Sequence, residues 1–249
     1  MTDHHRILVT GAASGIGAAV CDAAERDGFA VAGLDRAGRP GGRGPAGAGG
    51  RFFTTADVTD AAAVRTAFAA AAEALGGPIT GLVHCAGVYE PGGPTASLPA
   101  ESWARTLAVN ATGAFLVVRE FGRRLIGAGV GGSAVLLSSM ASRRGDRAAP
   151  AADYGASKGA LESLARGLAL EWGPAGIRVN VVRPGVIDTP MLKLKDDPEA
   201  AAAYLSGSVP LGRFGRASEV ADACLFLAGD RASYITGAVL DVDGGVLAG

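Results

Sequence analysis

Cysteine is scarce in this chain of 249 residues. Only Cys21, Cys85 and Cys224 occur, an odd number at wide spacing. That usage is not typical of a disulfide framework or a zinc site, and it favours reduced thiols in a cytoplasmic protein. Residues 1–5 are polar and lead directly into the first apolar run, so we expect no signal peptide.

The chain also lacks long runs of apolar residues and long runs of basic residues. No uninterrupted apolar stretch reaches the roughly 18 residues that a membrane-spanning helix needs, so no membrane is expected as a partner. The net charge is −1 and no long basic run occurs, which argues against a nucleic acid as a partner. Hydrophobic residues make up 49% of the chain, which is enough for a large buried core.

Lysine is rare in this chain, because most of its basic residues are arginine. Lys158 follows Tyr154 by four residues, a spacing that places a phenol and an ammonium on one face of a helix. Lysine is a compact point charge with rotatable donors, whereas arginine is a rigid fork. A lysine kept at this position therefore indicates a specific need, although the motif alone also fits a solvated helical pair. Asparagine is rarer still, with only Asn110 and Asn180.

Short apolar runs alternate with longer, alanine-rich stretches of helical character. Some runs, such as Ala134-Val135-Leu136-Leu137, are apolar throughout, as is typical of strands buried on both faces of a parallel sheet. The alternation predicts βαβ units in one α/β domain over 1–249, a doubly wound parallel sheet with helices on both faces. The seven expected strands lie near 6–10, 30–35, 52–56, 80–85, 133–138, 177–182 and 238–242. The expected helices lie near 15–27, 60–75, 99–124, 153–172 and 217–228.

Two segments interrupt this alternation. Residues 37–50 are rich in glycine, proline and arginine, which predicts a surface loop. Residues 190–214 follow a proline and are longer than an ordinary connection. Insertions of that length are often lids over a site, so we expect a substrate lid at 190–214.

A glycine-rich turn follows the first expected strand and precedes the first expected helix. It reads Gly11-Ala12-Ala13-Ser14-Gly15-Ile16-Gly17. Glycines let the backbone approach a pyrophosphate, and the helix N-terminus supplies free N–H groups. The spacing differs from the commoner G-x-G-x-x-G, so the turn by itself could be purely structural.

The residue that ends the second expected strand supports a cofactor-binding role for the glycine-rich turn. Asp35 lies some twenty residues further on, where an acid can bond the ribose hydroxyls of an adenosine. Its carboxylate would repel a 2′-phosphate, which favours NAD(H) over NADP(H). Arg36 could instead meet such a phosphate, which leaves NADP(H) as the alternative.

The order of these motifs resembles that of the short-chain dehydrogenase/reductase family over nearly the whole chain. Thr10 to Gly17 is similar to the family's T-G-x-x-x-G-x-G motif. Further similar segments are Asp57-Val58, Ala86-Gly87, Pro184-Gly185-Val186-Ile187-Asp188-Thr189 and Asp241-Val242-Asp243-Gly244-Gly245. Asn110, Ser139, Tyr154 and Lys158 fall in the order of the family's catalytic tetrad.

The resemblance implies a Rossmann fold, a nicotinamide cofactor and hydride transfer to or from a secondary alcohol or ketone. Tyr154 would be the general acid/base, Ser139 would hold the substrate oxygen, and Asn110 would position a water beside Lys158. The implied cofactor-binding residues are Gly11, Ser14, Gly15, Ile16, Gly17, Asp35, Arg36, Asp57, Val58, Ala86, Gly87, Asn110, Tyr154, Lys158, Pro184, Gly185, Ile187 and Thr189.

Lys158 is expected to activate the tyrosine. A phenol titrates near pH 10, and lowering its pKa by about three units takes about 4 kcal/mol. One cation at about 4 Å, with an effective dielectric near 20, supplies about that much. We therefore expect Lys158 to lower the pKa of Tyr154.

The chain departs from the family pattern in two places. His84 and Cys85 stand where the family usually has asparagine. Adjacent strand residues point to opposite faces, so we expect core packing here and no metal site. The stretch between Ser139 and Tyr154 is longer than is usual in the family, and Ser138 and Ser142 are alternatives for the catalytic serine.

The sequence says little about the substrate. A partly apolar lid indicates a small secondary alcohol or ketone, and a carboxylated cyclic diol is the specific guess. Arg143, Arg144 and Arg147 could meet an anionic group, although a solvated face is favoured. Two other functions compete with this one. The first is a non-catalytic dinucleotide-binding sensor or scaffold, and the second is lyase or isomerase chemistry. The family resemblance also implies a homotetramer.

Overall fold

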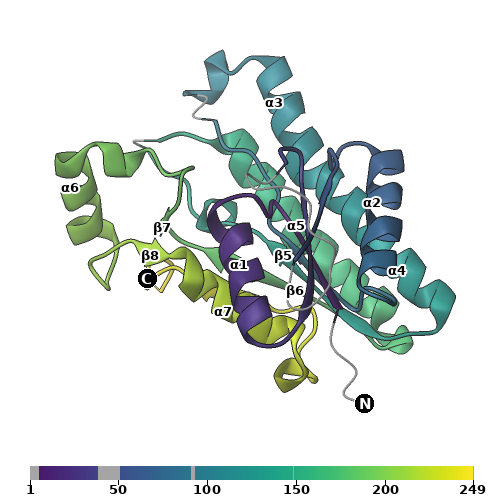
Figure 1. Ribbon diagram of the computed structural model, residues 1–249. Helices are drawn as coiled ribbons and strands as arrows, with labels where there is room; N and C mark the ends of the chain where they lie inside the picture. The colour runs from purple at the N-terminus through teal and green to yellow at the C-terminus, as the bar shows by residue number, and fades with distance from the viewer. Residues whose placement is uncertain (1–5, 39–50, 91–92, 148, 249) are drawn as a thin grey trace.

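A seven-stranded parallel sheet forms the centre of the protein (Figure 1). The computed structural model describes residues 6–38, 51–90, 93–147 and 149–248. The strand order is β3-β2-β1-β4-β5-β6-β9, and every neighbouring pair is parallel. The strands are β1 (Arg6–Thr10), β2 (Ala30–Asp35), β3 (Phe52–Thr55), β4 (Gly81–His84), β5 (Gly132–Leu137), β6 (Ile177–Pro184) and β9 (Val239–Val242). The predicted doubly wound α/β fold is confirmed.

Helices cover both faces of this sheet and bury two separate cores. On one face lie α2 (Ala61–Ala74), α4 (Ala114–Ala128) and α5 (Ala152–Trp172). On the other face α1 (Gly15–Arg26) and α7 (Ala217–Ala228) lie side by side (Figure 1). Successive strand residues point to opposite faces, so Leu8 joins the first core while Ile7 and Val9 join the second. This two-sided burial explains why runs such as Ala134–Leu137 are apolar throughout.

The helix expected over 99–124 is divided in the structure. α3 (Ala100–Leu107) runs into a π-helical turn at Ala108–Gly113, and α4 follows directly. Gly113 ends the turn where a Cβ would lie 2.8 Å from the Cγ2 atom of Val58. The predicted helical stretch is therefore confirmed, and the π-helical turn within it was not predicted, because the apolar pattern runs on through the turn.

The segment expected as a lid contains a helix that the sequence analysis did not predict. α6 (Pro198–Ser208) begins with proline in its first turn, and the Asp197 side chain accepts a hydrogen bond from the Ala200 N–H at 3.1 Å. Two short paired strands, β7 (Ile187–Asp188) and β8 (Gly215–Arg216), close the base of this segment. Figure 1 shows α6 standing away from the central sheet.

Two further expectations concern the loop at 37–50 and membrane-spanning helices. Most of the loop expected at 37–50 lies outside the described residues, since the structure describes only 37 and 38 of it. Within the described ranges, no helix has both the length and the apolar character needed to cross a membrane.

Candidate active site

A large cleft opens at the carboxyl edge of the sheet, where the strand order reverses between β1 and β4. Doubly wound sheets bind ligands at this point. The cleft has a volume of about 1710 Å³. That exceeds the roughly 300–1,000 Å³ of a single small-ligand site, so a cofactor and a substrate fit together.

The structure brings nearly all of the predicted site residues to this cleft. Those that line it are Gly11, Ser14, Gly15, Ile16, Gly17, Asp35, Arg36, Asp57, Val58, Ala86, Gly87, Ser139, Tyr154, Lys158, Pro184, Gly185, Ile187 and Thr189. Asn110 does not line it and is fully buried behind it.

The glycine turn presents bare backbone to the cleft. Gly11 has a φ of +66°, and a Cβ on it would lie 2.9 Å from the Ala86 backbone nitrogen. A Cβ on Gly17 would lie 2.1 Å from the Gly11 carbonyl oxygen. The Ser14 side chain does not cap α1, which leaves the N–H groups of its first turn available to an anion. The turn therefore fits a pyrophosphate.

Carboxylates lie at the end of β2 and just beyond the end of β3. The Asp35 carboxylate accepts hydrogen bonds from the Ala13 N–H at 3.0 Å and the Ala37 N–H at 3.1 Å. It is thereby fixed at the end of β2, on the lining of the cleft. The Asp57 carboxylate accepts from the Thr59 N–H at 2.9 Å and the Thr59 hydroxyl at 2.7 Å. These bonds, the backbone one first, lower the pKa of Asp57.

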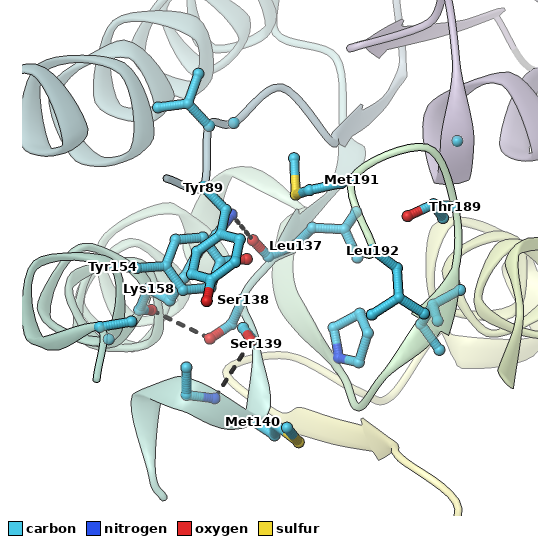
Figure 2. A pocket seen from close by; sticks show the side chains of 18 of the residues that line it. Tyr89, Leu137, Ser138, Ser139, Met140, Tyr154, Lys158, Thr189, Met191 and Leu192 are labelled. Carbon is cyan, nitrogen blue, oxygen red and sulfur yellow. Dashed lines mark hydrogen bonds between the residues drawn. The ribbon is translucent and has the colours of Figure 1, made fainter. Parts of the chain in front are cut away.

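Tyr154, Lys158 and Ser139 meet further along the cleft (Figure 2). Tyr154 and Lys158 share α5, and the Lys158 Nζ lies 5.6 Å from the centroid of the Tyr154 ring. The same Nζ donates to the Leu137 carbonyl at 2.9 Å, at the end of β5. Ser139 follows that strand, and its hydroxyl lowers the pKa of Tyr154 against the effect of burial. Strand β5 and helix α5 together therefore fix the relative positions of the three side chains.

The expected effect of Lys158 on the tyrosine is not found. Burial raises the pKa of Tyr154 to about 12, and the Ser139 hydrogen bond opposes this only in part. Lys158 is itself 4% exposed, and burial lowers the pKa of its ammonium to about 8. The four-residue spacing reflects only the attraction between the two groups, whereas burial disfavours the charged form of each of them.

Asn110 lies in the π-helical turn between α3 and α4. Its Oδ1 accepts from the Val88 N–H at 2.8 Å, and its Nδ2 donates to the Val88 carbonyl at 2.9 Å and to the Ser157 hydroxyl at 3.0 Å. Isolated π turns are often found at functional sites. Here the turn carries an amide that ties the segment after β4 to α5.

The two alternative serines are bound to one acid that the sequence analysis did not single out. The Ser138 hydroxyl lies 2.8 Å from Glu162 Oε1, and the Ser142 hydroxyl lies 2.5 Å from the same atom. The Ser139 hydroxyl instead accepts from the Ala141 N–H at 3.2 Å. The signal for Glu162 was present, because it follows Tyr154 and Lys158 at intervals of four residues.

His84 packs in the interior as expected. Its Nδ1 lies 2.9 Å from the Thr10 hydroxyl, and burial lowers the pKa of His84 to about 3, aided by the charge of Lys158. Cys85 packs against the core as expected, and it also borders the cleft. Burial raises the pKa of its thiol, which leaves the thiol protonated.

The substrate end of the cleft mixes aromatic, apolar and charged groups. The Tyr89 ring meets that of Tyr154 edge-on, with 5.0 Å between the centroids. Figure 2 shows Met191 and Leu192 across the cleft from these two rings. Arg144 also lines the cleft.

The other groups predicted near the substrate are placed as follows. Tyr204 of α6 reaches the cleft, with its hydroxyl 3.9 Å from the Met140 sulfur. Arg143 and Arg147 are exposed and do not line the cleft. Only one of the three arginines is therefore placed to meet a substrate.

Comparison with known proteins agrees with this geometry. The chain matches a family model described as "Enoyl-(Acyl carrier protein) reductase" over residues 11–247. It is 42% identical over 245 residues to a galactitol 2-dehydrogenase (L-tagatose-forming) of Cereibacter sphaeroides, covering 95% of this chain and 92% of that protein. It is 40% identical over 248 residues to a D-threitol dehydrogenase of Mycolicibacterium smegmatis, covering 96% and 91%.

A solved structure gives the same result. A short-chain type dehydrogenase/reductase from Mycobacterium ulcerans has a TM-score of 0.86 and 32% sequence identity, covering 98% of this chain and 90% of that chain. The motifs, the sheet and the cleft thus coincide with one group of proteins. This chain belongs to the short-chain dehydrogenase/reductase family.

Proposed function

We propose that the protein is an oxidoreductase that interconverts a secondary alcohol and a ketone with a nicotinamide cofactor. One observation carries the proposal: Tyr154, Ser139 and Lys158 line the same cleft as a glycine turn that fits a pyrophosphate. A nicotinamide bound there would exchange a hydride with the carbinol carbon, and its oxidised ring would add a positive charge near Tyr154.

Tyr154 would exchange the proton of the substrate hydroxyl. In the oxidation direction the phenol must act as a base, so its raised pKa has to fall when the ligands are bound. The Ser139 hydroxyl would bond the substrate oxygen. Lys158 would stabilise the phenolate, since a pKa of about 8 leaves its ammonium largely protonated at neutral pH.

Asn110 would complete this site by positioning a water beside Lys158. A Cβ on Gly87 would lie 3.2 Å from Asn110 Oδ1 and equally 3.2 Å from Lys158 Nζ. The amide and the ammonium therefore border the same short stretch of backbone. A water between them would give the Lys158 proton a route toward solvent.

NAD(H) is the proposed cofactor, in preference to NADP(H). The Asp35 carboxylate is held in place by two backbone N–H groups on the lining of the cleft. A fixed carboxylate can accept hydrogen bonds from the ribose hydroxyls and would repel a 2′-phosphate. Arg36 lines the same end, so NADP(H) is the alternative to be tested.

Polyols are the proposed substrates. Two similar proteins act on galactitol and D-threitol by name. Hydroxyl-bearing Tyr89 and Tyr204 both line this end of the cleft. A carboxylated cyclic diol is the second candidate, and Arg144 on the lining is the observation that favours it.

The proposal extends to the lid, the assembly and the location of the protein. The 190–214 segment would act as a lid, because Met191, Leu192 and Tyr204 reach the cleft from it. A homotetramer would cover the apolar side chains exposed on α4, on α5 and near β9, which are Phe115, Ile126, Leu170, Tyr234 and Leu240. The scarce and widely spaced cysteines favour the cytoplasm.

An NAD⁺-linked screen of sugar alcohols and other secondary alcohols tests the proposal, with NADH absorbance as the readout. Tyr154→Phe should lower kcat by at least about 100-fold, because it removes the acid/base group. NADH binding, followed by fluorescence, should stay nearly intact. A Tyr154→Phe variant that turns over as fast as the wild type would contradict the mechanism.

A further inference from the structure

Glu162 is a largely buried acid on α5 that the proposed chemistry does not use. Tyr154, Lys158 and Glu162 follow one another at four-residue intervals, so they share one face of the helix. The Glu162 side chain is 12% exposed. Buried charges are costly unless they are paired and hydrogen-bonded, so its partners are informative.

Glu162 contacts both ends of the short segment that carries Ser139. Its Oε1 lies 2.8 Å from the Ser138 hydroxyl and 2.5 Å from the Ser142 hydroxyl. Each hydroxyl also has a backbone neighbour, the Lys158 carbonyl at 3.1 Å for Ser138 and the Ser139 carbonyl at 2.7 Å for Ser142. Ser138 and Ser142 thus flank Ser139 and reach the same carboxylate oxygen.

The hydroxyl protons decide which of these contacts dominates. A serine has a single hydroxyl proton, and a carboxylate is a stronger acceptor than a backbone carbonyl. Both protons are therefore best placed on Glu162. Without the carboxylate, the Ser142 hydroxyl would bond only the Ser139 carbonyl inside its own turn. The tie between that end of the segment and α5 would be lost.

A buried ion pair holds Glu162 from the opposite side. Arg183 of β6 places NH1 at 3.3 Å from both carboxylate oxygens of Glu162. The same guanidinium donates to Asp241 of β9 at 2.5 Å and 3.0 Å. The acid is therefore fixed by the sheet as well as by its own helix.

We propose that Glu162 is a positioning residue for Ser139, because it holds both flanks of the 138–142 segment against the helix that carries Tyr154 and Lys158. The inference rests on the proposed function and adds to it a residue that touches neither substrate nor cofactor.

The proposal has a consequence for the ionisation of Tyr154. The Ser139 hydroxyl lowers the pKa of Tyr154 against the effect of burial. A displaced Ser139 should therefore raise that pKa further. The other titratable groups that face Tyr154 are Lys158 on its own helix and Tyr89 from the segment after β4. Glu162→Ala changes neither of them directly.

The test uses the full chain and two readouts. The first is ultraviolet titration of tyrosinate, with the Tyr154→Phe signal subtracted, which requires no substrate. The second is the pH dependence of kcat for NAD⁺-linked alcohol oxidation. Glu162→Ala should raise the pKa of Tyr154 and lower kcat about tenfold, the equivalent of one lost hydrogen bond, with KM for NAD⁺ unchanged.

Four further variants complete the set. Ser139→Ala gives the full size of the effect, and Ser142→Ala should shift both readouts in the same direction by less. Glu162→Gln should recover most of kcat, because an amide oxygen still accepts the serine hydroxyls. Glu171→Ala, an exposed acid on the same helix, is the matched control and should behave as wild type.

The outcomes separate this inference from the proposed function. If Ser139→Ala shifts the titration of Tyr154 and Glu162→Ala does not, the positioning role is overturned while the proposed function stands. If Ser139→Ala shifts nothing, both the positioning role and the proposed role of Ser139 are wrong. If Glu162→Ala fails to fold, Ser142→Ala decides, since it keeps the contact between Ser138 and Glu162.

Discussion

Lys158 keeps an ammonium in the protein interior, and this should leave a measurable mark on stability. The side chain is 4% exposed, and burial lowers its pKa from 10.5 to about 8. Below about pH 8 the folded and unfolded chains both carry the proton on Lys158, so the folded state bears the full free-energy cost of burying the ammonium. Between about pH 8 and pH 10.5 the unfolded chain binds more protons than the folded one, so stability rises with pH.

The magnitude follows from the two pKa values. Their difference corresponds to about 3 kcal/mol of unfolding free energy. Lys158→Met removes the titrating group and also the bond to the Leu137 carbonyl, which the variant lacks at every pH. The stability of the wild type relative to Lys158→Met should therefore increase by about 3 kcal/mol across this window.

Urea unfolding followed by circular dichroism measures this difference at several pH values. Lys193→Met is the matched control, because Lys193 is exposed, and its difference from wild type should not change with pH. A difference between wild type and Lys158→Met that stays constant from about pH 8 to pH 10.5 would refute the argument from burial.

Three other predictions concern the cofactor end and the core. Asp35→Asn removes the charge that faces the ribose, so the ratio of NADPH to NADH affinity should rise about tenfold in fluorescence titrations; an unchanged ratio would contradict the proposed preference. Gly17→Ala places a Cβ 2.1 Å from the Gly11 carbonyl and should lower thermal stability and abolish NADH binding. Gly167→Ala meets nothing within 4 Å and is its control; equal behaviour of the two variants would count against the close packing of the turn. Phe121→Ala should cost about 3–5 kcal/mol in urea unfolding, because the ring is 1% exposed; a cost below about 1 kcal/mol would show that the cavity collapses.

The sheet could be predicted because both of its faces are buried. β5 is apolar over Ala134–Leu137, and the structure places Ala134 and Leu136 in one core and Val135 and Leu137 in the other. A continuous apolar run of this kind can be recognised from residues that are adjacent in the sequence. The order of motifs along the chain similarly predicted which residues meet at the carboxyl edge of the sheet.

Features that depend on three-dimensional contacts could not be predicted. The π-helical turn at Ala108–Gly113 lies in a continuous helical pattern, and its amide at Asn110 bonds Val88 from a different segment. Glu162 shares the four-residue spacing of Tyr154 and Lys158, but only the fold places it beside Ser138 and Ser142. The pKa of Tyr154 depends on burial, which the spacing to Lys158 does not reveal.

The π-helical turn also makes the length of its helix a constraint on the site. A π-helical turn holds about one more residue than an α-helical turn, so deleting one residue from Ala108–Gly113 would allow a regular α-helix in which α3 and α4 keep nearly the same relative rotation. The Thr106 hydroxyl would then still face the Asp153 carboxylate, to which it donates at 2.8 Å. Asn110 lies inside the turn and would lose its place against Val88. Homologous chains that align here with a single-residue gap should therefore have changed the Asn110 contact while keeping the one at Thr106, whereas chains of equal length can keep both.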